Sequence, residues 1–211
     1  MNAISWDQSI RDFIQQAGSS APTPGGGSVA ALVAALGASM TAMVGNLSQG
    51  DKFVDVHEQI AAAIRVMNDL TAACEELLAS DIAAFQQYME ALRLPKQTAE
   101  EKDLRSQAIQ AATAAAITVP LRLMEVCRDG LRCTLTIAEN SNKNVISDLG
   151  IGAILFEAAA QSANLTIEIN LASLKDSEAR RQYMKQMLDL ISAIEELKSK
   201  TLLAVRSRII G

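Results

Sequence analysis

The chain has 211 residues, enough for one domain with a sizeable buried core. Apolar residues make up 49% of the chain and aromatic residues only 3%, and alanine supplies much of the difference. This composition is typical of closely packed helices and argues against a β-sandwich. The net charge of −5 and the lack of a basic stripe argue against a nucleic-acid partner. We therefore predict one all-α domain over residues 1–211.

The cysteine and histidine content excludes several kinds of catalytic and metal site. Cys74, Cys127 and Cys133 form an odd set without CxxC spacing, which indicates buried, reduced thiols in a cytoplasmic protein. No signal peptide is predicted at the N-terminus. His57 is the only histidine, so neither a zinc site nor a histidine-based catalytic triad has enough partners. We predict no metal and no prosthetic group, and catalysis by carboxylates, lysine, backbone dipoles and bound water.

The first predicted helix covers residues 5–17 and is amphipathic. Ser5 is placed to cap it, and Gly18 is placed to end it. Its apolar stripe consists of Trp6, Ile10, Phe13 and Ile14.

The chain is then broken by two prolines and by three consecutive glycines, Gly25, Gly26 and Gly27. Glycine can take positive φ and lets another backbone or a ligand approach closely. Ser28 is the predicted N-cap of the next helix. Free N–H groups at this helix start could hold an anion or another ligand, although a purely structural turn explains the glycines about as well.

The next predicted helix, residues 29–47, is apolar on all sides and must be buried in protein or in lipid. Asn46 and the absence of a basic flank argue against lipid. Small residues recur every four positions and permit other helices to pack closely: Ala30, Ala34, Ala38 and Ala42. We predict the central helix of a bundle and no membrane association.

A helix over residues 55–92 is unusually long for a domain of this size. At about 1.5 Å per residue it would span more than roughly 50 Å, so it protrudes, bends or packs against a second subunit. Asp81 lies near its end among apolar neighbours, a setting that suits a carboxyl group to acid/base chemistry. Periodicity alone nevertheless favours a solvent-facing aspartate on the polar side of this helix.

The second half of the chain also has a helical pattern. Thr98 and Glu101 match a capping box that opens a helix over residues 99–139, and Pro120 is predicted to kink or split it. A polar loop over residues 140–147 leads to another apolar helix, which Asp148 could cap. The last helix opens at residue 176 or 177 and continues to about Arg208. We predict an all-α bundle of five or six mostly long helices that dimerises through its long helices.

Four stretches of the sequence stand out: PTPGGGSVAALVAALGASMTAMV, SDIAAFQQYMEALRLPKQTAEEKDLR, ITVPLRLMEV and NKNVISDLGIGAILFEAAAQSANLTIEINL. Together and in this order they resemble the cyclodeaminase/cyclohydrolase family, over about residues 5–205. The family includes the cyclodeaminase half of bifunctional formimidoyltransferase-cyclodeaminase and stand-alone methenyltetrahydrofolate cyclohydrolases. The resemblance implies an all-helical homodimer with a folate site near the subunit interface.

The resemblance also implies chemistry on the one-carbon bridge between N5 and N10 of tetrahydrofolate. A cyclodeaminase converts 5-formimidoyltetrahydrofolate into 5,10-methenyltetrahydrofolate and ammonia. A cyclohydrolase adds water to the methenyl bridge and yields 10-formyltetrahydrofolate. Both reactions pass through a tetrahedral carbon, and we lean toward the cyclodeaminase. Its substrate would come from a separate formimidoyltransferase.

The family's acid/base position falls on Asp81, and Ala79 stands where relatives often have a second acidic residue. Asp81 would therefore act alone or with water. The resemblance further suggests substrate contacts by a set of flanking residues: Gly25, Gly26, Gly27 and Ser28 toward the pterin or the bridge, Lys96 toward a folate carboxylate, and Lys143 and Asp148 in the polar loop, with Asp148 toward the pterin edge. For each lysine the alternative is an ordinary solvated side chain.

Two other interpretations of the sequence, neither of them a soluble enzyme, stay open. A helical dimer that keeps the fold without the chemistry would bind folate without turnover, and Ala79 is the one residue that favours it. A membrane bundle of small residues would need detergent for solubility.

Overall fold

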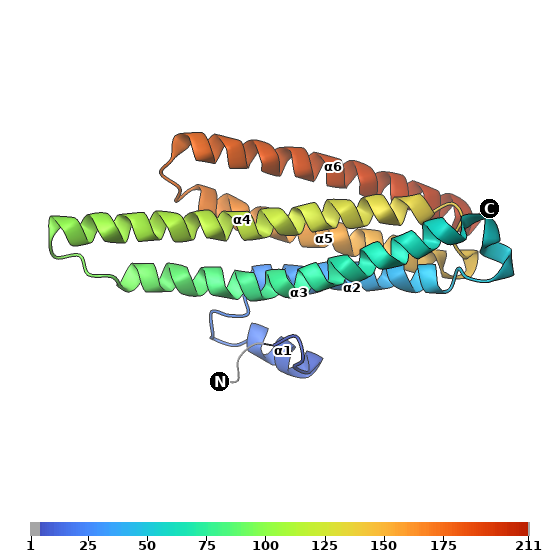
Figure 1. Cartoon of the computed structure of the whole chain (residues 1–211), viewed down its shortest axis with the longest axis horizontal. Coiled ribbons are helices and arrows are strands. Elements are labelled where there is room, and N and C mark those ends of the chain that lie inside the picture. Colours follow the sequence, from blue (N-terminus) through green and yellow to red (C-terminus); the bar gives the residue numbers. More distant parts are fainter. Residues whose placement is uncertain (1–4, 211) are drawn as a thin grey trace.

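The computed structural model describes residues 5–210 as an all-helical bundle with no strand among them (Figure 1). The ends of the predicted domain, residues 1–4 and 211, lie outside the described residues. The helices are α1 (Ile10–Ala17), α2 (Gly26–Asn46), α3 (His57–Arg93), α4 (Ala99–Ile137), α5 (Ile146–Leu171) and α6 (Ser177–Ile210), with short 3₁₀ turns at Asp51–Val56 and Lys143–Val145. The predicted fold class is confirmed, with five long helices and one short one.

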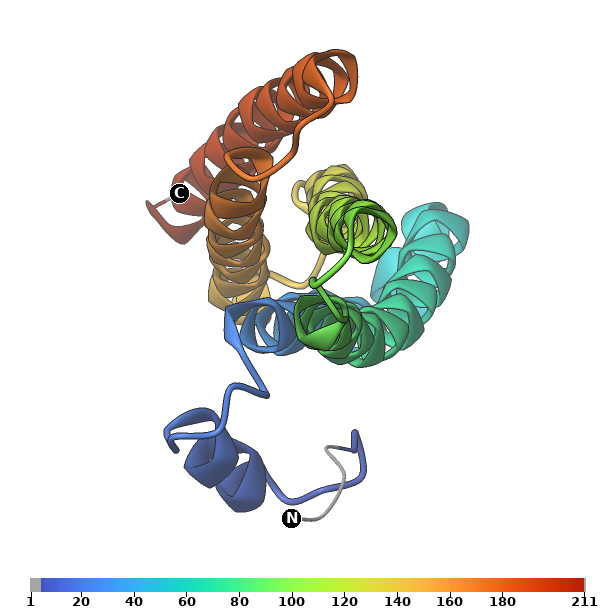
Figure 2. The same cartoon turned by 90° about the vertical axis from the view of Figure 1, so that its left-hand side faces the viewer.

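The helix α2 is the centre of one side of the bundle. It packs between α3 and α5, while α4 packs against α3, α5 and α6. The hairpin of α3 and α4 extends past the other helices at one end of the molecule (Figure 1). The N-terminal segment with α1 lies outside this bundle, below the layer formed by α2 and α3 (Figure 2).

The core depends on glycines that face one large side chain. Phe156 of α5 is fully buried. A Cβ atom on Gly130 of α4 would lie 2.3 Å from Phe156 Cζ, and one on Gly37 of α2 would lie 3.3 Å from its ring. A Cβ atom on Gly152 would lie 3.0 Å from the carbonyl oxygen of Gly37. These missing side chains are what lets α2, α4 and α5 meet around one phenyl ring.

Pro120 was predicted to kink or split its helix, and the split is wrong, because α4 continues without a break from Ala99 to Ile137. Proline removes the N–H that would bond to the carbonyl four residues earlier, which here belongs to Ala116. Asn170 of α5 donates its Nδ2 to that carbonyl at 3.4 Å and to the Thr166 carbonyl at 2.7 Å. A side chain from the neighbouring helix therefore compensates for the lost bond.

The first helix is shorter than predicted. It begins at Ile10 with Ser9 as its N-cap, since the Ser9 side chain accepts from the Asp12 backbone N–H at 3.1 Å. Phe13 is the buried member of the predicted stripe, whereas Ile10 and Ile14 are 79% and 63% exposed. The α1 helix is thus amphipathic with much of its apolar stripe uncovered in the single chain.

Two predicted helix starts are confirmed. Thr98 and Glu101 form a reciprocal capping box at the start of α4. The Asp176 carboxylate accepts from the backbone N–H groups of Glu178 at 2.9 Å and Ala179 at 3.0 Å, which caps α6.

Replacing Gly130 with alanine tests the packing around Phe156. Helix propensity by itself favours alanine by about 1 kcal/mol, whereas a methyl group here would overlap the buried ring. We expect a net loss of about 1–3 kcal/mol in the free energy of unfolding, the usual cost of overpacking. Urea denaturation measures it. Gly18→Ala, where the added Cβ meets only an ordinary contact at 3.4 Å, is the control; equal behaviour of the two variants would contradict this packing.

Candidate active site

The Asp81 side chain of α3 meets the first turn of α2. Ser28 donates its hydroxyl to Asp81 Oδ2 at 2.7 Å. Ser28 is fully buried and Asp81 is partly exposed. The hydroxyl therefore holds the carboxylate from inside the protein, while the carboxylate itself can reach a substrate.

The predicted capping role of Ser28 is wrong. The helix α2 begins at Gly26 with Gly25 as its N-cap, and no side chain caps it. Ser28 lies inside the first turn, where its hydroxyl is directed to Asp81 of the neighbouring helix. Ser28 does form a side-chain hydrogen bond, but its partner is 53 residues away in the sequence and not in the same helix.

Gly27 makes this contact possible. A Cβ atom at Gly27 would lie 2.1 Å from Asp81 Oδ1, so any side chain would displace the carboxylate. Gly26 differs, because a Cβ atom there would meet nothing within 4 Å. None of Gly25, Gly26 and Gly27 has a positive φ. A glycine is therefore needed in this turn only at position 27, because there the Asp81 side chain comes too close to the backbone for any Cβ atom.

The electrostatic setting suits a carboxylate. The start of a helix carries partial positive charge, and its first N–H groups lack partners within the helix. Asp81 lies against this end of α2. Its Oδ2 atom is held by Ser28, and Oδ1 accepts no hydrogen bond from the described residues. The site thus presents a fixed carboxylate with one oxygen available for proton transfer.

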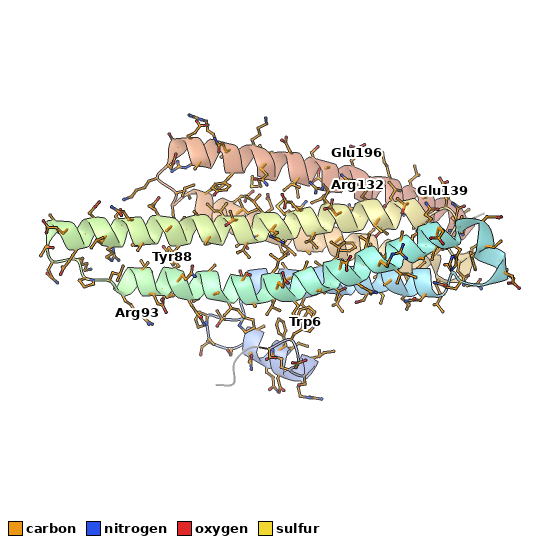
Figure 3. All side chains as sticks on the ribbon, viewed as in Figure 1. Trp6, Tyr88, Arg93, Arg132, Glu139 and Glu196 are labelled. Carbon is orange, nitrogen blue, oxygen red and sulfur yellow. The ribbon has the colours of Figure 1, made fainter. Side chains whose placement is uncertain are left out.

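Three of the predicted substrate contacts lie elsewhere in the single chain. Lys96 is exposed in the loop that joins α3 to α4. Arg93, the last residue of α3, lies toward the far end of the α3–α4 hairpin (Figure 3). Twelve helical residues separate Asp81 from Arg93, about 18 Å along α3. Lys96 therefore does not join Asp81 within one chain.

Lys143 and Asp148 lie at the opposite end of α2. Asn142, next to Lys143, donates its Nδ2 to the Leu47 carbonyl at 2.9 Å, at the C-terminus of α2. The 21 residues of α2 separate this end from Asp81 by about 30 Å. Asp148 is also not the predicted cap: α5 has Val145 as its N-cap, and Asp148 lies within its first turn.

Ala79 is exposed and two residues before Asp81. Side chains two positions apart on a helix do not face each other. A carboxylate at position 79 would therefore point away from the Ser28–Asp81 contact within the same chain, so alanine at this position leaves that contact intact.

The thiols are poor candidates for chemistry. Burial raises the pKa of Cys74 to about 12 and that of Cys133 to about 11, and it raises the pKa of Cys127 well above its ordinary value. A thiol with such a pKa stays protonated and unreactive near neutral pH. Within residues 5–210, no three side chains of histidine, cysteine, aspartate or glutamate come together as a metal site.

Comparison with known proteins extends over nearly the whole chain. The family model described as Formiminotransferase-cyclodeaminase matches residues 9–189. A methenyltetrahydrofolate cyclohydrolase from Methylorubrum extorquens is 34% identical over 204 residues, which cover 96% of this chain and 98% of that protein. A formimidoyltransferase-cyclodeaminase from Mus musculus is 32% identical over 202 residues, but the match spans only 37% of that protein.

A solved structure is also similar to this chain over nearly its whole length. The formiminotetrahydrofolate cyclodeaminase from Thermotoga maritima superposes with a TM-score of 0.86 at 25% identity, covering 95% of this chain and 97% of that one. The similarity therefore includes both the helical fold and the sequence.

A double-mutant cycle tests the contact between Gly27 and Asp81. We expect Gly27→Ala to lower the free energy of unfolding by about 1–3 kcal/mol through overlap with the carboxylate. The same change combined with Asp81→Ala should cost clearly less than the sum of the two single changes. Gly26→Ala is the matched control, because its added methyl group meets open space. Additive effects in the cycle would rule out the contact.

Proposed function

The chain belongs to the formiminotransferase-cyclodeaminase family, and from this premise we propose that it is an enzyme acting on the N5–N10 bridge of a tetrahydrofolate. The observation that carries the proposal is the Asp81 carboxylate, fixed by Ser28 over the first turn of α2. A fixed carboxylate with a free oxygen can accept a proton in one step and return it in the next.

The first candidate reaction is that of a formimidoyltetrahydrofolate cyclodeaminase. N10 attacks the formimidoyl carbon, and a tetrahedral carbon forms between the two nitrogens. Asp81 takes the N10 proton and then gives a proton to the departing amino group, so that ammonia leaves and the methenyl bridge remains. The solved neighbour of nearly equal length, which is itself a formiminotetrahydrofolate cyclodeaminase, supports this candidate.

The second candidate is a methenyltetrahydrofolate cyclohydrolase. Its specific support is the relative of that name, which this chain matches over 98% of the relative's length at 34% identity. Asp81 would take a proton from the water that attacks the bridge carbon and return it to N5 as the C–N5 bond breaks. The remaining hydroxyl proton is released to solvent as the formyl C=O bond forms. The product is 10-formyltetrahydrofolate, reached through the same kind of tetrahedral carbon.

The neighbouring residues have different roles in this proposal. Ser28 positions Asp81, because its hydroxyl is buried and already donates to the carboxylate. Gly25 and Gly26 stay candidate substrate contacts, and the space above Gly26 is open to a ligand. Lys143 and Asp148 can join a site at Asp81 only from a second copy of the chain, because they lie at the opposite end of α2. Lys96, beyond the end of α3 and more than about 18 Å from Asp81, stays a candidate contact for the distant folate carboxylate.

An uncovered apolar face supports the proposal of a homodimer. On α2, exposed or partly exposed apolar residues recur at spacings of three and four: Val29, Val33, Leu36, Met40, Met43 and Leu47. On the adjacent α5, the exposed apolar residues are Ile151, Ile154, Leu165 and Ile169. We call these two rows the α2–α5 face. A contiguous apolar face of this kind marks an interaction surface.

Lipid is the other environment that could cover this face. By length and composition alone, α2 and the segment Lys143–Leu171 are apolar enough to cross a membrane. Half of the α2 window is nevertheless buried against other helices of the bundle, which is also what a core helix shows. We propose a second copy as the occupant, since the two apolar rows run along the long helices α2 and α5 and offer an extended surface to another helical bundle.

The proposal also includes the source of the substrate and the location of the protein in the cell. The bifunctional relatives, of which this chain spans 37% in the mouse protein, support a separate formimidoyltransferase as the source of a formimidoyl substrate. The cytoplasmic location remains a prediction from the cysteine content. The folate derivative is proposed as the substrate, without a further prosthetic group.

The direct test of this function follows methenyl absorbance with two substrates. Appearance from 5-formimidoyltetrahydrofolate identifies the cyclodeaminase, and loss of 5,10-methenyltetrahydrofolate above the spontaneous rate identifies the cyclohydrolase. We expect Asp81→Asn to lower turnover by about 10²-fold or more. Asp69→Asn, an exposed aspartate on the same helix, should leave turnover unchanged.

Near-normal turnover of Asp81→Asn would remove Asp81 from the mechanism. A folded wild-type protein that binds folate and turns over neither substrate would instead favour the non-catalytic dimer.

Changing Leu36 to glutamate tests the proposed dimer. A carboxylate placed within an apolar interface is strongly disfavoured, so Leu36→Glu should sediment as a monomer at micromolar concentration, where the wild type is a dimer. The control is Leu104→Glu, an exposed leucine outside the α2–α5 face, which should stay dimeric. A monomeric wild type, or a protein that dissolves only with detergent, would contradict the proposal.

A further inference from the structure

A small cavity lies between the N-terminal segment and the bundle. Its volume is about 190 Å³. Trp6 and Phe13 supply its aromatic walls, Leu32 of α2 and Leu78 of α3 supply its aliphatic walls, and Gln8 lines it as well. Figure 3 shows Trp6 on the N-terminal segment, close to the layer of α2 and α3.

This cavity is one helical turn from the catalytic carboxylate. Leu32 follows Ser28 by four residues on α2, and Leu78 precedes Asp81 by three residues on α3. Residues at these spacings are neighbours on one helix face, about 5–6 Å apart. Because Ser28 bonds to Asp81 across the two helices, both leucines lie on the same side of that bond.

Gln8, which lines this space, carries an unpartnered donor. Its Nε2 atom is buried and has no hydrogen-bond partner among the described residues. Buried polar atoms without a partner are uncommon in folded proteins because their lost hydration is not replaced. An acceptor atom on a bound ligand would satisfy it.

Larger grooves do not offer such a donor. One lies between α4 and α6 and another between α3 and α4, and Arg128 lines both. The Arg128 guanidinium already donates to the Asp129 carboxylate at 2.9 Å and 3.1 Å. The Arg128 charge is therefore already paired within the chain, and Lys185, which lines the groove between α4 and α6, is exposed to solvent.

We propose that the cavity binds the pterin ring of the folate substrate, packed against Trp6 and accepting a hydrogen bond from Gln8 Nε2. The inference rests on the proposed function. An apolar cavity of about 150 Å³ holds benzene, so this space of about 190 Å³ suits the flat pyrimidine ring of the pterin and excludes the rest of a folate. N5 belongs to the pterin ring, so a ring seated here puts the one-carbon bridge near Asp81.

The ring also matches the chemistry of the walls. The pyrimidine ring of a pterin has flat faces, and its edge carries carbonyl and ring-nitrogen acceptors beside N–H donors. Aromatic side chains stack on such faces, and one amide donor suffices to choose the orientation of the ring edge. The p-aminobenzoylglutamate part would extend away from the cavity, past Asp81.

Fluorescence provides the first test, because Trp6 is the only tryptophan in the chain. We expect 5-formyltetrahydrofolate and 6-methyltetrahydropterin to quench its emission after inner-filter correction with N-acetyltryptophanamide. The other half of the substrate, p-aminobenzoylglutamate, should not quench it. Unchanged Trp6 emission while calorimetry detects 5-formyltetrahydrofolate binding would overturn the proposal.

Gln8→Leu provides the second test. Loss of one hydrogen bond should raise KM about tenfold with kcat nearly unchanged. The melting temperature of the free protein should stay the same or rise, because a buried donor without a partner has been removed. Gln15→Leu, an exposed glutamine of α1, is the matched control and should change neither constant. An unchanged KM, or a lowered melting temperature with lowered kcat, would contradict a binding role.

The failure of this inference and that of the proposed function are distinguishable. Asp81→Asn should bind 5-formyltetrahydrofolate and quench Trp6 while it loses turnover. An active enzyme whose Trp6 does not respond overturns the cavity assignment and keeps the function. Quenching by the pterin probe without turnover of either folate substrate keeps the cavity assignment and removes the function.

Discussion

Close approach to α2 is the constraint on which both the fold and the site depend. On the side of α5, Gly37 lies against the Gly152 carbonyl and the Phe156 ring. On the side of α3, Gly27 lies against the Asp81 carboxylate. Neither contact leaves room for a side chain at that position of α2. A helix built largely of alanine and glycine is poorly amphipathic, but it is the kind of helix that can have neighbours this near on two sides.

The same constraint accounts for where the chemistry lies. A carboxylate can be held rigidly if one of its oxygens has a buried donor and the other remains free. Ser28 is such a donor, since it is fully buried within the first turn of α2. The start of α2 is also the one place on this apolar helix with free N–H groups and positive partial charge. Packing and electrostatics therefore favour the same position for Asp81.

Much of the fold could be predicted from the sequence because the relevant signals are local. The capping box at Thr98 and the aspartate cap of α6 depend on residues three positions apart or fewer, and both were found. The predicted split at Pro120 is wrong for the opposite reason. Its effect on α4 is offset by Asn170, which is 50 residues away in the sequence and meets it only in the folded bundle.

The site was predictable only in part. Asp81 was singled out by resemblance to a family, while periodicity alone favoured a solvated side chain. The bond from Ser28 to Asp81 and the need for glycine at position 27 have no local signal, because they join two helices. The motifs in the sequence also suggested three residues that do not lie beside Asp81. Each of them is at an end of the bundle: Lys96, Lys143 and Asp148. Whether Lys143 and Asp148 contact substrate depends on a second copy of the chain.

The most direct measurement is a crystal structure of the protein with bound 5-formyltetrahydrofolate. We predict that N10 lies within about 2.6–3.2 Å of Asp81, or one water molecule away, as proton transfer requires. Ser28 should still donate to Oδ2 in that complex. A folate bound elsewhere, for example in the groove between α4 and α6 that Arg128 and Lys185 line, would contradict the assignment of Asp81 as the catalytic group.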